Sequence, residues 1–288
     1  MSLAKVKLAA FDMDGTLLNE DSHMTDATKE ACALLQQQGC KLVISTGRTY
    51  LSAKRPTDNY PFDGYVCSNG ATIYEQDGTL VQSVLLPIEV VMATVAELRG
   101  KKIYYELHDA ESNRWMVAED RDEIEAILEQ ATCHDGLSLR KFSFYHVSKS
   151  VPEKELMESV ISGERPIVKV FVWHTDSDEL MGVRQKLAPW EQSATFTSSS
   201  CNNFEVIASG VSKASGLAYF FDKWGITAEE TVAFGDSFND TELLSAVGYP
   251  VVMANADDSI KPLGKYTAPD HRENGVAQFI HQHLLSNK

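Results

Sequence analysis

Apolar and polar positions along the first part of the chain follow the pattern of an alternating α/β fold. Between residues 25 and 39 the apolar positions recur with the spacing of one helix face, with Thr25 or Asp26 placed to cap the helix and Gly39 to end it. Short apolar runs typical of buried strands flank this helix: Val6–Phe11 before it, Leu42–Ile44 and Tyr65–Cys67 after it. This order predicts a doubly wound, Rossmann-like parallel sheet.

The pattern changes in the middle of the chain. Along Ile167–Trp173 three valines fall on one face and Lys169, Phe171 and Trp173 on the other, which is typical of an antiparallel strand with one face packed on helices. Thr195–Ser199 and Phe204–Ile207 predict a closing hairpin. The other expected helices and strands are Ile88–Leu98, Lys102–Leu107, Arg114–Val117, Glu123–Gln130, Phe142–Val147 and Glu179–Leu187. We interpret residues 85–208 as an inserted α+β cap domain containing an antiparallel sheet.

Doubly wound character resumes in the last part of the chain. A helix over Ser212–Trp224, ended by Gly225, precedes the apolar strand Thr231–Phe234. A short helix, a further strand and a last helix are expected at Glu242–Val247, at Val251–Met253 and from about Gly275. The predicted organisation is therefore a core built from residues 1–84 and 209–288, interrupted by the insertion at 85–208.

Composition narrows the possible partners. A net charge of −15 over 288 residues opposes binding to nucleic acid and to anionic membranes, which both require a basic surface. No apolar run reaches the length of a membrane span, and the start of the chain lacks the charged and apolar regions of a signal peptide. The five cysteines are scattered without a CxxC pair, which favours reduced thiols in a cytoplasmic protein. The sequence does not indicate the oligomeric state.

Acidic side chains follow the ends of two predicted strands. Asp12 and Asp14 come directly after the first strand, and Asp236 and Asp240 follow Thr231–Phe234. The carboxyl ends of parallel strands meet at one edge of a sheet, so we expect these carboxylates to lie close together. Such a cluster repels itself unless a cation is bound, and oxygen donors alone favour Mg²⁺. Taken singly, Asp236 and Asp240 could instead cap the helix that follows them.

Other polar groups expected at the same edge suit a phosphoryl group. Hydroxyl, guanidinium, ammonium and amide groups are the usual partners of phosphoryl oxygens. They are supplied by Thr46, Arg48, Lys213, Asn69 and Asn239. Lys213 also stands at the start of its predicted helix, where backbone N–H groups favour an anion.

Four short motifs, in this order, resemble those of the haloacid dehalogenase superfamily. They are Asp-Met-Asp-Gly-Thr from Asp12, Ser-Thr-Gly-Arg from Ser45, Val-Ser-Lys ending at Lys213, and Gly-Asp-Ser-Phe-Asn-Asp ending at Asp240. Ser-Asn-Gly-Ala from Ser68, the large insertion and a late Gly-Val-Ala resemble the Cof-type sugar phosphatases, which carry a class IIB cap. The resemblance covers the whole chain.

The resemblance implies a role for each residue. Asp12 would be the nucleophile that becomes an aspartyl-phosphate, and Asp14 the general acid and base. Mg²⁺ would be held by Asp12, the backbone carbonyl of Asp14 and Asp236, with Asp240 either a ligand or a partner of the ligands. The phosphate and substrate would contact Thr46, Gly47, Arg48, Asn69, Lys213 and Asn239. The chain departs from the family in having Ala214 where a glycine usually follows the motif lysine.

The expected function is a Mg²⁺-dependent phosphatase of small phosphorylated metabolites, sugar phosphates above all. A phosphomannomutase-like phosphosugar mutase, a phosphatase of pyridoxal phosphate or flavin mononucleotide, and a non-catalytic binding module are the alternatives. Glu205, in the predicted hairpin, could reach the substrate. Motifs of other catalytic classes, such as GxGxxG, the Walker A sequence, GxSxG and HExxH, are absent from the sequence.

Overall fold

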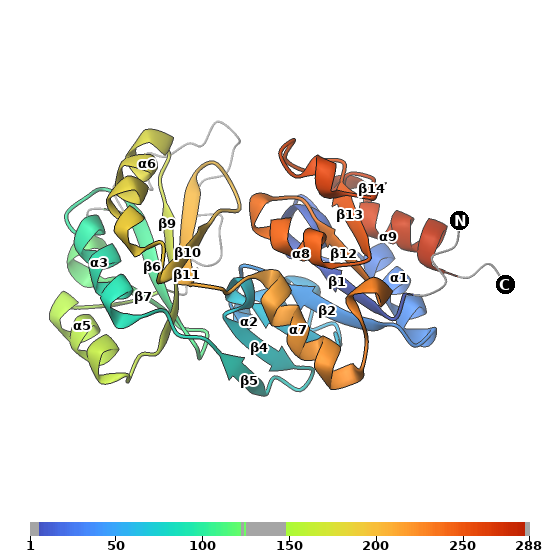
Figure 1. Ribbon diagram of the computed structural model, residues 1–288, viewed down its shortest axis with the longest axis horizontal. Helices are drawn as coiled ribbons and strands as arrows, with labels where there is room; N and C mark the ends of the chain where they lie inside the picture. The colour runs from blue at the N-terminus through green and yellow to red at the C-terminus, as the bar shows by residue number, and fades with distance from the viewer. Residues whose placement is uncertain (1–5, 122–123, 125–147, 286–288) are drawn as a thin grey trace. The chain divides into compact units, whose positions relative to one another are not determined.

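The strands form two sheets, one of eight strands and one of six (Figure 1). In the computed structural model, which describes residues 6–121, 124 and 148–285, the chain divides into two units. The first unit joins Met1–Gln82 to Val211–Lys288, and the second spans Ser83–Gly210. That the inserted unit is an independent domain stays a prediction.

The sheet of the first unit has the predicted doubly wound order. Its strands run β14-β13-β12-β1-β2-β3-β4-β5 across the sheet, parallel from β14 to β3 and antiparallel between β3 and β4. Their bounds are β1 (Leu8–Phe11), β2 (Lys41–Ser45), β3 (Gly64–Cys67), β4 (Thr72–Glu75), β5 (Leu80–Ser83), β12 (Thr231–Gly235), β13 (Tyr249–Met253) and β14 (Tyr266–Ala268). In the register, Phe11 lies beside Phe234 on one side and Ile44 on the other. The loops that follow these three strands therefore start at the same edge.

Helices cover both faces of this sheet (Figure 1). Ala9 and Phe11 pack with residues of α1 (Asp26–Gln37) and α9 (Gly275–Phe279). Leu8 and Ala10, which point the other way, pack with residues of α7 (Lys213–Trp224) and α8 (Thr241–Ala246). Alternate residues of β1 thus enter two separate apolar clusters, which is why the strand reads as a continuous apolar run. A short helix, α2 (Tyr50–Lys54), follows β2.

The helix signals in the sequence act as expected. The Thr25 hydroxyl accepts a hydrogen bond from the Thr28 N–H at 3.3 Å, and Gly39, just beyond the end of α1, has a φ of +86°. Ser212 caps α7, and Gly225 ends it in the left-handed conformation. The Ser212 cap fixes where α7 begins, so Lys213 is the first residue of the helix.

The second unit combines an antiparallel-rich sheet with helices packed on it. Its sheet has the order β10-β11-β9-β6-β7-β8, antiparallel except for the parallel pair β7–β8. The strands are β6 (Tyr104–Asp109), β7 (Arg114–Val117), β8 (Lys149–Val151), β9 (Ile167–Trp173), β10 (Ala194–Thr197) and β11 (Asn203–Ala208). The apolar face, with Val170 and Val172, packs on helices α3 (Ile88–Leu98), α5 (Glu153–Ser162) and α6 (Ser177–Lys186). The class of fold expected from the sequence is confirmed.

The opposite side of this sheet carries buried charges that the alternation pattern did not predict as buried. Lys169 donates to Glu205 at 3.0 Å, and both side chains are at most 5% exposed. Glu106 lies 2.9 Å from Nε2 of His108, and burial lowers the pKa of His108 to about 4. Glu205, which we expected could reach a substrate, is thus engaged in an ion pair.

Several elements were not predicted from the sequence. They are β4, β5, β8, β14, α2 and α5. The strands are only three or four residues long and lie toward sheet edges, so their hydrophobic signal is weak. The expected segments Glu123–Gln130, apart from Ile124, and Phe142–Val147 lie outside the described residues.

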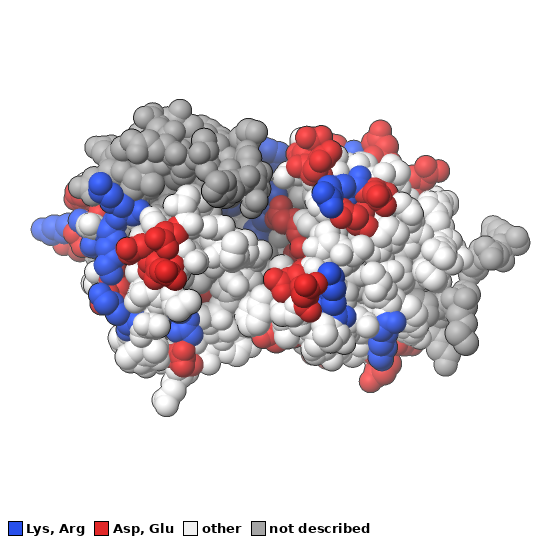
Figure 2. Space-filling model, turned by 90° about the horizontal axis from the view of Figure 1, so that it is seen from above, with Lys and Arg blue, Asp and Glu red and all other residues white. Residues whose placement is uncertain are grey.

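Acidic and basic side chains both occur on the face of the molecule drawn in Figure 2. They lie among uncharged side chains in both units. Within the described ranges, no helix is long and apolar enough to cross a membrane.

Candidate active site

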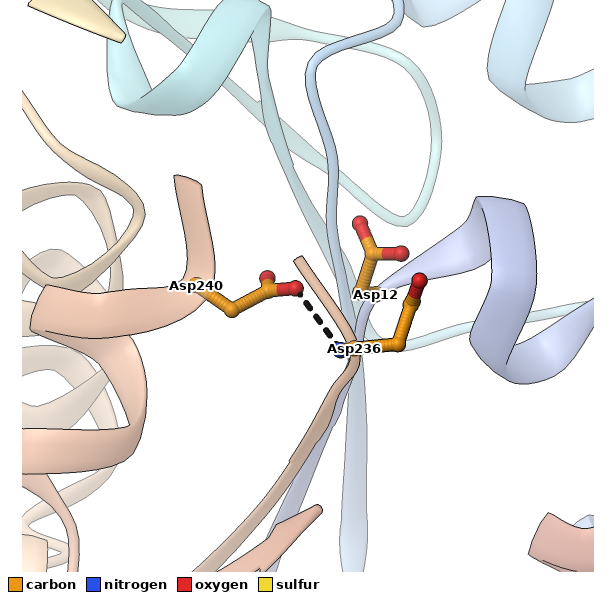
Figure 3. Close-up of side chains that lie close together, drawn as sticks. All are labelled: Asp12, Asp236 and Asp240. Carbon is orange, nitrogen blue, oxygen red and sulfur yellow. Dashed lines mark hydrogen bonds between the residues drawn. The ribbon is translucent and has the colours of Figure 1, made fainter. Parts of the chain in front are cut away.

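Three carboxylates meet at the carboxyl edge of the parallel sheet. Asp12 follows β1, Asp236 follows β12, and Asp240 lies one turn further along the chain (Figure 3). One oxygen from each carboxylate lies within 4.8 Å of the other two. Asp12 is 5% exposed and Asp240 is fully buried. The structure thus brings together three of the four acids that the strand ends predicted, whereas the Asp14 side chain pairs with Arg48 instead.

Lys213 lies among these carboxylates. Its ammonium donates to Asp12 Oδ1 at 2.5 Å, to Asp240 Oδ1 at 2.6 Å and to Asn239 Oδ1 at 3.2 Å. These three acceptors match the three N–H groups of the ammonium, and the side chain is fully buried. Burial opposes the charged form, but the two carboxylates outweigh it and raise the pKa of Lys213. The lysine therefore stays charged and offsets part of the acidic charge.

Close packing holds Lys213 in place. The start of α7 lies against the turn at Ser68–Gly70, where a Cβ on Gly70 would stand 2.0 Å from the Ser212 carbonyl oxygen. Gly70 also has a φ of +99°, so glycine is required there on two grounds. Ala214 is partly exposed within a regular helix, and its methyl group does not disturb the start of α7.

Asp240 is occupied by hydrogen bonds within the protein. Its Oδ1 accepts from Lys213, and its Oδ2 accepts from the backbone N–H groups of Asp236 at 3.0 Å and Ser237 at 3.1 Å. Figure 3 shows the bond to the Asp236 nitrogen. These contacts fix the loop that presents Asp236, so the geometry favours a positioning role for Asp240 over direct metal ligation.

Asp14 is turned toward Arg48 rather than toward Asp12. Arg48 donates to both carboxylate oxygens of Asp14, at 2.8 Å from Nε and 2.5 Å from Nη2, and to the Ser52 carbonyl at 3.2 Å. Desolvation tends to raise the pKa of Asp14, but the guanidinium overcomes it and holds that pKa below its ordinary value. The Asp14 side chain is 56% exposed, so the pair lies at the open side of the site.

The loops after β2 and β3 are joined by their backbones. The Asn69 N–H donates to the Thr46 carbonyl at 3.0 Å, and the Ser68 N–H donates to the Arg48 carbonyl at 2.9 Å. Asn69 in turn accepts a hydrogen bond from Asn239 at 3.2 Å. Thr46, Asn69 and Asn239 are buried, and Gly47 lies between Thr46 and Arg48.

The sequence reasoning missed two residues of this region. Thr16 donates from its hydroxyl to Asp236 Oδ1 at 2.6 Å. Asn255, just beyond β13, donates to the Gly15 carbonyl at 2.8 Å. Thr16 belongs to the first motif, and Asn255 closely follows the predicted strand Val251–Met253, so both positions carried a signal that could have singled them out.

Electrostatics of the site favour a bound cation. Burial raises the pKa of Asp236 to about 7, with a further contribution from Asp240. Burial also raises the pKa of Asp12, and Lys213 opposes this rise only in part. Without a cation, these two clustered carboxylates resist ionisation. Because they offer oxygen donors only, they fit a hard divalent ion such as Mg²⁺.

The fold and this cluster define the class of the protein. A doubly wound core with an inserted α+β unit, and an acidic site with one buried lysine at the carboxyl edge of its sheet, characterise a capped α/β hydrolytic enzyme. The chain belongs to the haloacid dehalogenase-like hydrolase family, whose model matches residues 9–280. The resemblance that the four motifs indicated is confirmed.

Named relatives place the chain among the phosphatases of this family. The 5-amino-6-(5-phospho-D-ribitylamino)uracil phosphatase YcsE of Bacillus subtilis (strain 168) is 28% identical over 281 residues, which cover 97% of this chain and 96% of that protein. A haloacid dehalogenase-like hydrolase from B. subtilis, of known structure, is 25% identical with a TM-score of 0.82, covering 97% of this chain and 100% of the other. A subclass IIB sugar phosphatase shares the fold, with 23% identity, a TM-score of 0.75, and coverage of 96% and 98%.

Proposed function

We propose that the protein is a Mg²⁺-dependent phosphatase that hydrolyses small phosphorylated metabolites, sugar phosphates above all, through an aspartyl-phosphate. The observation that carries this proposal is the placement of the Lys213 ammonium between Asp12 and Asp240, at the edge where Asp236 also emerges. Lys213 partly offsets the burial that disfavours the ionised form of Asp12, and a bound cation would add to this effect, which would make the Asp12 carboxylate available as a nucleophile.

Asp12, Asp236 and the backbone carbonyl of Asp14 would hold the cation. When bound, Mg²⁺ neutralises charge on the phosphoryl oxygens and on the carboxylates that surround them. Asp240 and Thr16 hold Asp236 from two sides, through its backbone N–H and its Oδ1. The cation site is thus prepared by residues that need not touch the cation.

Asp12 would attack phosphorus with one carboxylate oxygen. A bond forms between that oxygen and phosphorus, the bond from phosphorus to the leaving oxygen breaks, and Asp14 gives its proton to the leaving alkoxide. Asp14 then takes a proton from the water that hydrolyses the acyl phosphate, which frees Asp12 and releases phosphate. Lys213, bound to Asp12, offsets the charge that this exchange moves through the site.

Arg48 would set the working state of Asp14. Its two hydrogen bonds stabilise the ionised carboxylate, which is the form required to activate water. Donation of a proton to the leaving group requires the neutral acid, so we propose that Arg48 turns from Asp14 toward the substrate in the first step. Arg48→Ala should therefore slow the hydrolysis of the aspartyl-phosphate, which needs ionised Asp14, and should also weaken substrate binding.

The test of the mechanism is the substitution Asp12→Asn. It keeps the shape of the side chain but removes the nucleophile, so hydrolysis of p-nitrophenyl phosphate in Mg²⁺ should fall to background while the circular dichroism spectrum is unchanged. Asp21→Asn, at an exposed position, is the matched control and should retain full activity. Substantial phosphate release by Asp12→Asn would rule out the aspartyl-phosphate route.

The substrate is a separate question with a separate assay. The name of the B. subtilis relative points to a phosphorylated ribityl compound as one candidate, alongside hexose and pentose phosphates. We propose a phosphate-release screen over sugar phosphates, 5-amino-6-(5-phospho-D-ribitylamino)uracil, pyridoxal phosphate and flavin mononucleotide, with Mg²⁺ and with EDTA. A mutase would interconvert hexose 1- and 6-phosphates without net release of phosphate, and that result would replace the phosphatase proposal.

A further inference from the structure

Asn255 joins two loops at the edge of the sheet. It lies two residues beyond β13, and its side-chain amide donates to the Gly15 carbonyl at 2.8 Å. Its carbonyl oxygen accepts from the backbone N–H of His271 at 3.1 Å. The amide therefore uses its donor and its acceptor on two segments that are far apart in the sequence.

The Gly15 carbonyl belongs to the turn that presents the candidate cation ligands. Gly15 has φ +79° and ψ −1°, a backbone conformation that glycine adopts without a steric penalty. Glycine also loses more conformational entropy on folding than other residues do. On the other side of this turn there is no free space, because a Cβ on Gly15 would stand 2.4 Å from Asp236 Oδ2. The Asn255 hydrogen bond thus restrains how the peptide after Gly15 points, in the same turn as the Asp14 carbonyl.

The loop that carries Asn255 also holds Asp236. The backbone N–H of Asp257 donates to the Asp236 carbonyl at 3.0 Å. The short loop after β13 is therefore hydrogen-bonded to the loops after β1 and β12, from which the proposed cation ligands come. Neither hydrogen bond uses an atom that would bind the cation.

We propose that Asn255 is a positioning residue for the cation site: it fixes the Asp14–Gly15 turn so that the Asp14 carbonyl and Asp236 are held together before the cation arrives. This inference rests on the proposed function for the identity of the site. Loss of partners that orient ligands typically weakens metal binding by about 10- to 100-fold.

The experiment compares Mn²⁺ binding, as a probe of the Mg²⁺ site, by isothermal titration calorimetry in wild type, Asn255→Leu and Asn255→Asp. Asn255→Leu removes both hydrogen bonds at similar size. Asn255→Asp keeps the acceptor for His271 but replaces the donor that faces the Gly15 carbonyl. Both variants should bind Mn²⁺ at least about tenfold more weakly. Asn19→Asp is the matched control, because the side-chain oxygen of Asn19 accepts from the N–H groups of Asp21 and His23, and aspartate keeps that acceptor.

The Asn255→Asp variant separates positioning from simple electrostatics. An added negative charge near the site would by itself tighten cation binding, so weaker binding identifies lost positioning. Activity at saturating Mg²⁺ should recover toward wild type in both variants, while the Mg²⁺ concentration for half-maximal activity rises. Wild-type affinity in Asn255→Leu, or equal or tighter binding in Asn255→Asp, would overturn the inference.

The outcome is distinguishable from failure of the proposed function. A wild-type protein that binds Mn²⁺ but releases no phosphate from any substrate would refute the phosphatase proposal, while the binding comparison would still test Asn255. A wild-type protein that does not bind Mn²⁺ would refute both.

Discussion

Replacement of Gly15 by alanine tests the geometry of the catalytic turn most directly. The residue has a φ of +79°, and its missing side chain leaves room for Asp236. A Cβ would lie 2.4 Å from Asp236 Oδ2 and 2.8 Å from its Cγ. Asp236 cannot simply turn aside, because Thr16 holds its other oxygen at 2.6 Å. The alanine variant must therefore displace a proposed cation ligand or the turn itself.

The expected magnitude follows from two separate effects. An L-residue in the left-handed conformation costs about 1–2 kcal/mol, and forcing an extra carbon into a filled space costs about 1–3 kcal/mol. The free energy of unfolding should thus fall by about 2–5 kcal/mol. Ordinary contact begins at 3.4 Å, so the carboxylate and the new carbon must separate by about 1 Å more than now. A displacement of that size can lower the rate of catalysis by about 10²-fold.

Gly39→Ala is the matched control. Gly39 has a similar φ of +86°, but a Cβ there would meet no atom within 4 Å. It should therefore show the cost of the backbone conformation alone, about 1–2 kcal/mol, with unchanged activity. Urea unfolding measures the stability of each variant, and hydrolysis of p-nitrophenyl phosphate against Mg²⁺ concentration measures the state of the site.

The comparison can refute the reasoning in a simple way. Equal losses of stability in the two variants, together with an unchanged Mg²⁺ dependence in Gly15→Ala, would show that Asp236 does not restrict this turn. The close approach of Gly15 to Asp236 would then have no part in holding the cation site.

Two further predictions concern the charges of the cluster. Lys213→Met should lower the free energy of unfolding by about 3–5 kcal/mol, because Asp12 and Asp240 would be left buried without their partner. Urea unfolding in EDTA measures this loss. An unchanged free energy of unfolding would contradict the importance of the ion pairs. The pKa of Asp236, raised by burial to about 7, means that the folded metal-free protein holds a proton more tightly than the unfolded chain. Its stability in EDTA should therefore fall as the pH rises from about 4 to about 7, and Mg²⁺ should stabilise the protein more at pH 8 than at pH 5. Asp236→Asn should remove much of this fall, and an unchanged pH profile in that variant would assign it to other groups.

The sequence predicted the core well where local rules apply. The apolar run before Asp12, the cap Thr25, and the glycines that end α1 and α7 correspond to the observed elements, and the predicted start of α7 at Ser212 is one residue early because Ser212 is its cap. These signals act within a few residues of the chain and do not depend on distant contacts. Short edge strands such as β5 and β14 lack such signals, because few of their side chains are buried.

The buried charges of the inserted sheet show the limit of pattern reasoning. Lys169 falls on the strand face opposite the three valines, as the alternation predicts, yet it is 2% exposed and paired with Glu205. A lysine reads as solvent-exposed in any alternation pattern, and only the three-dimensional arrangement can supply the partner that makes its burial possible.

At the candidate site, the sequence by itself determined which chemical groups reach the edge of the sheet. Strand ends and motif order were sufficient to select Asp12, Asp236 and Lys213. The tertiary structure alone decided how these groups are divided between tasks: Lys213 pairs with two acids, Asp240 holds a loop, and Asn255 reaches the turn at Gly15. The physical reason is that hydrogen bonds of this kind join residues as much as 240 positions apart. The local preferences of a chain segment for helix, strand or turn cannot predict such contacts.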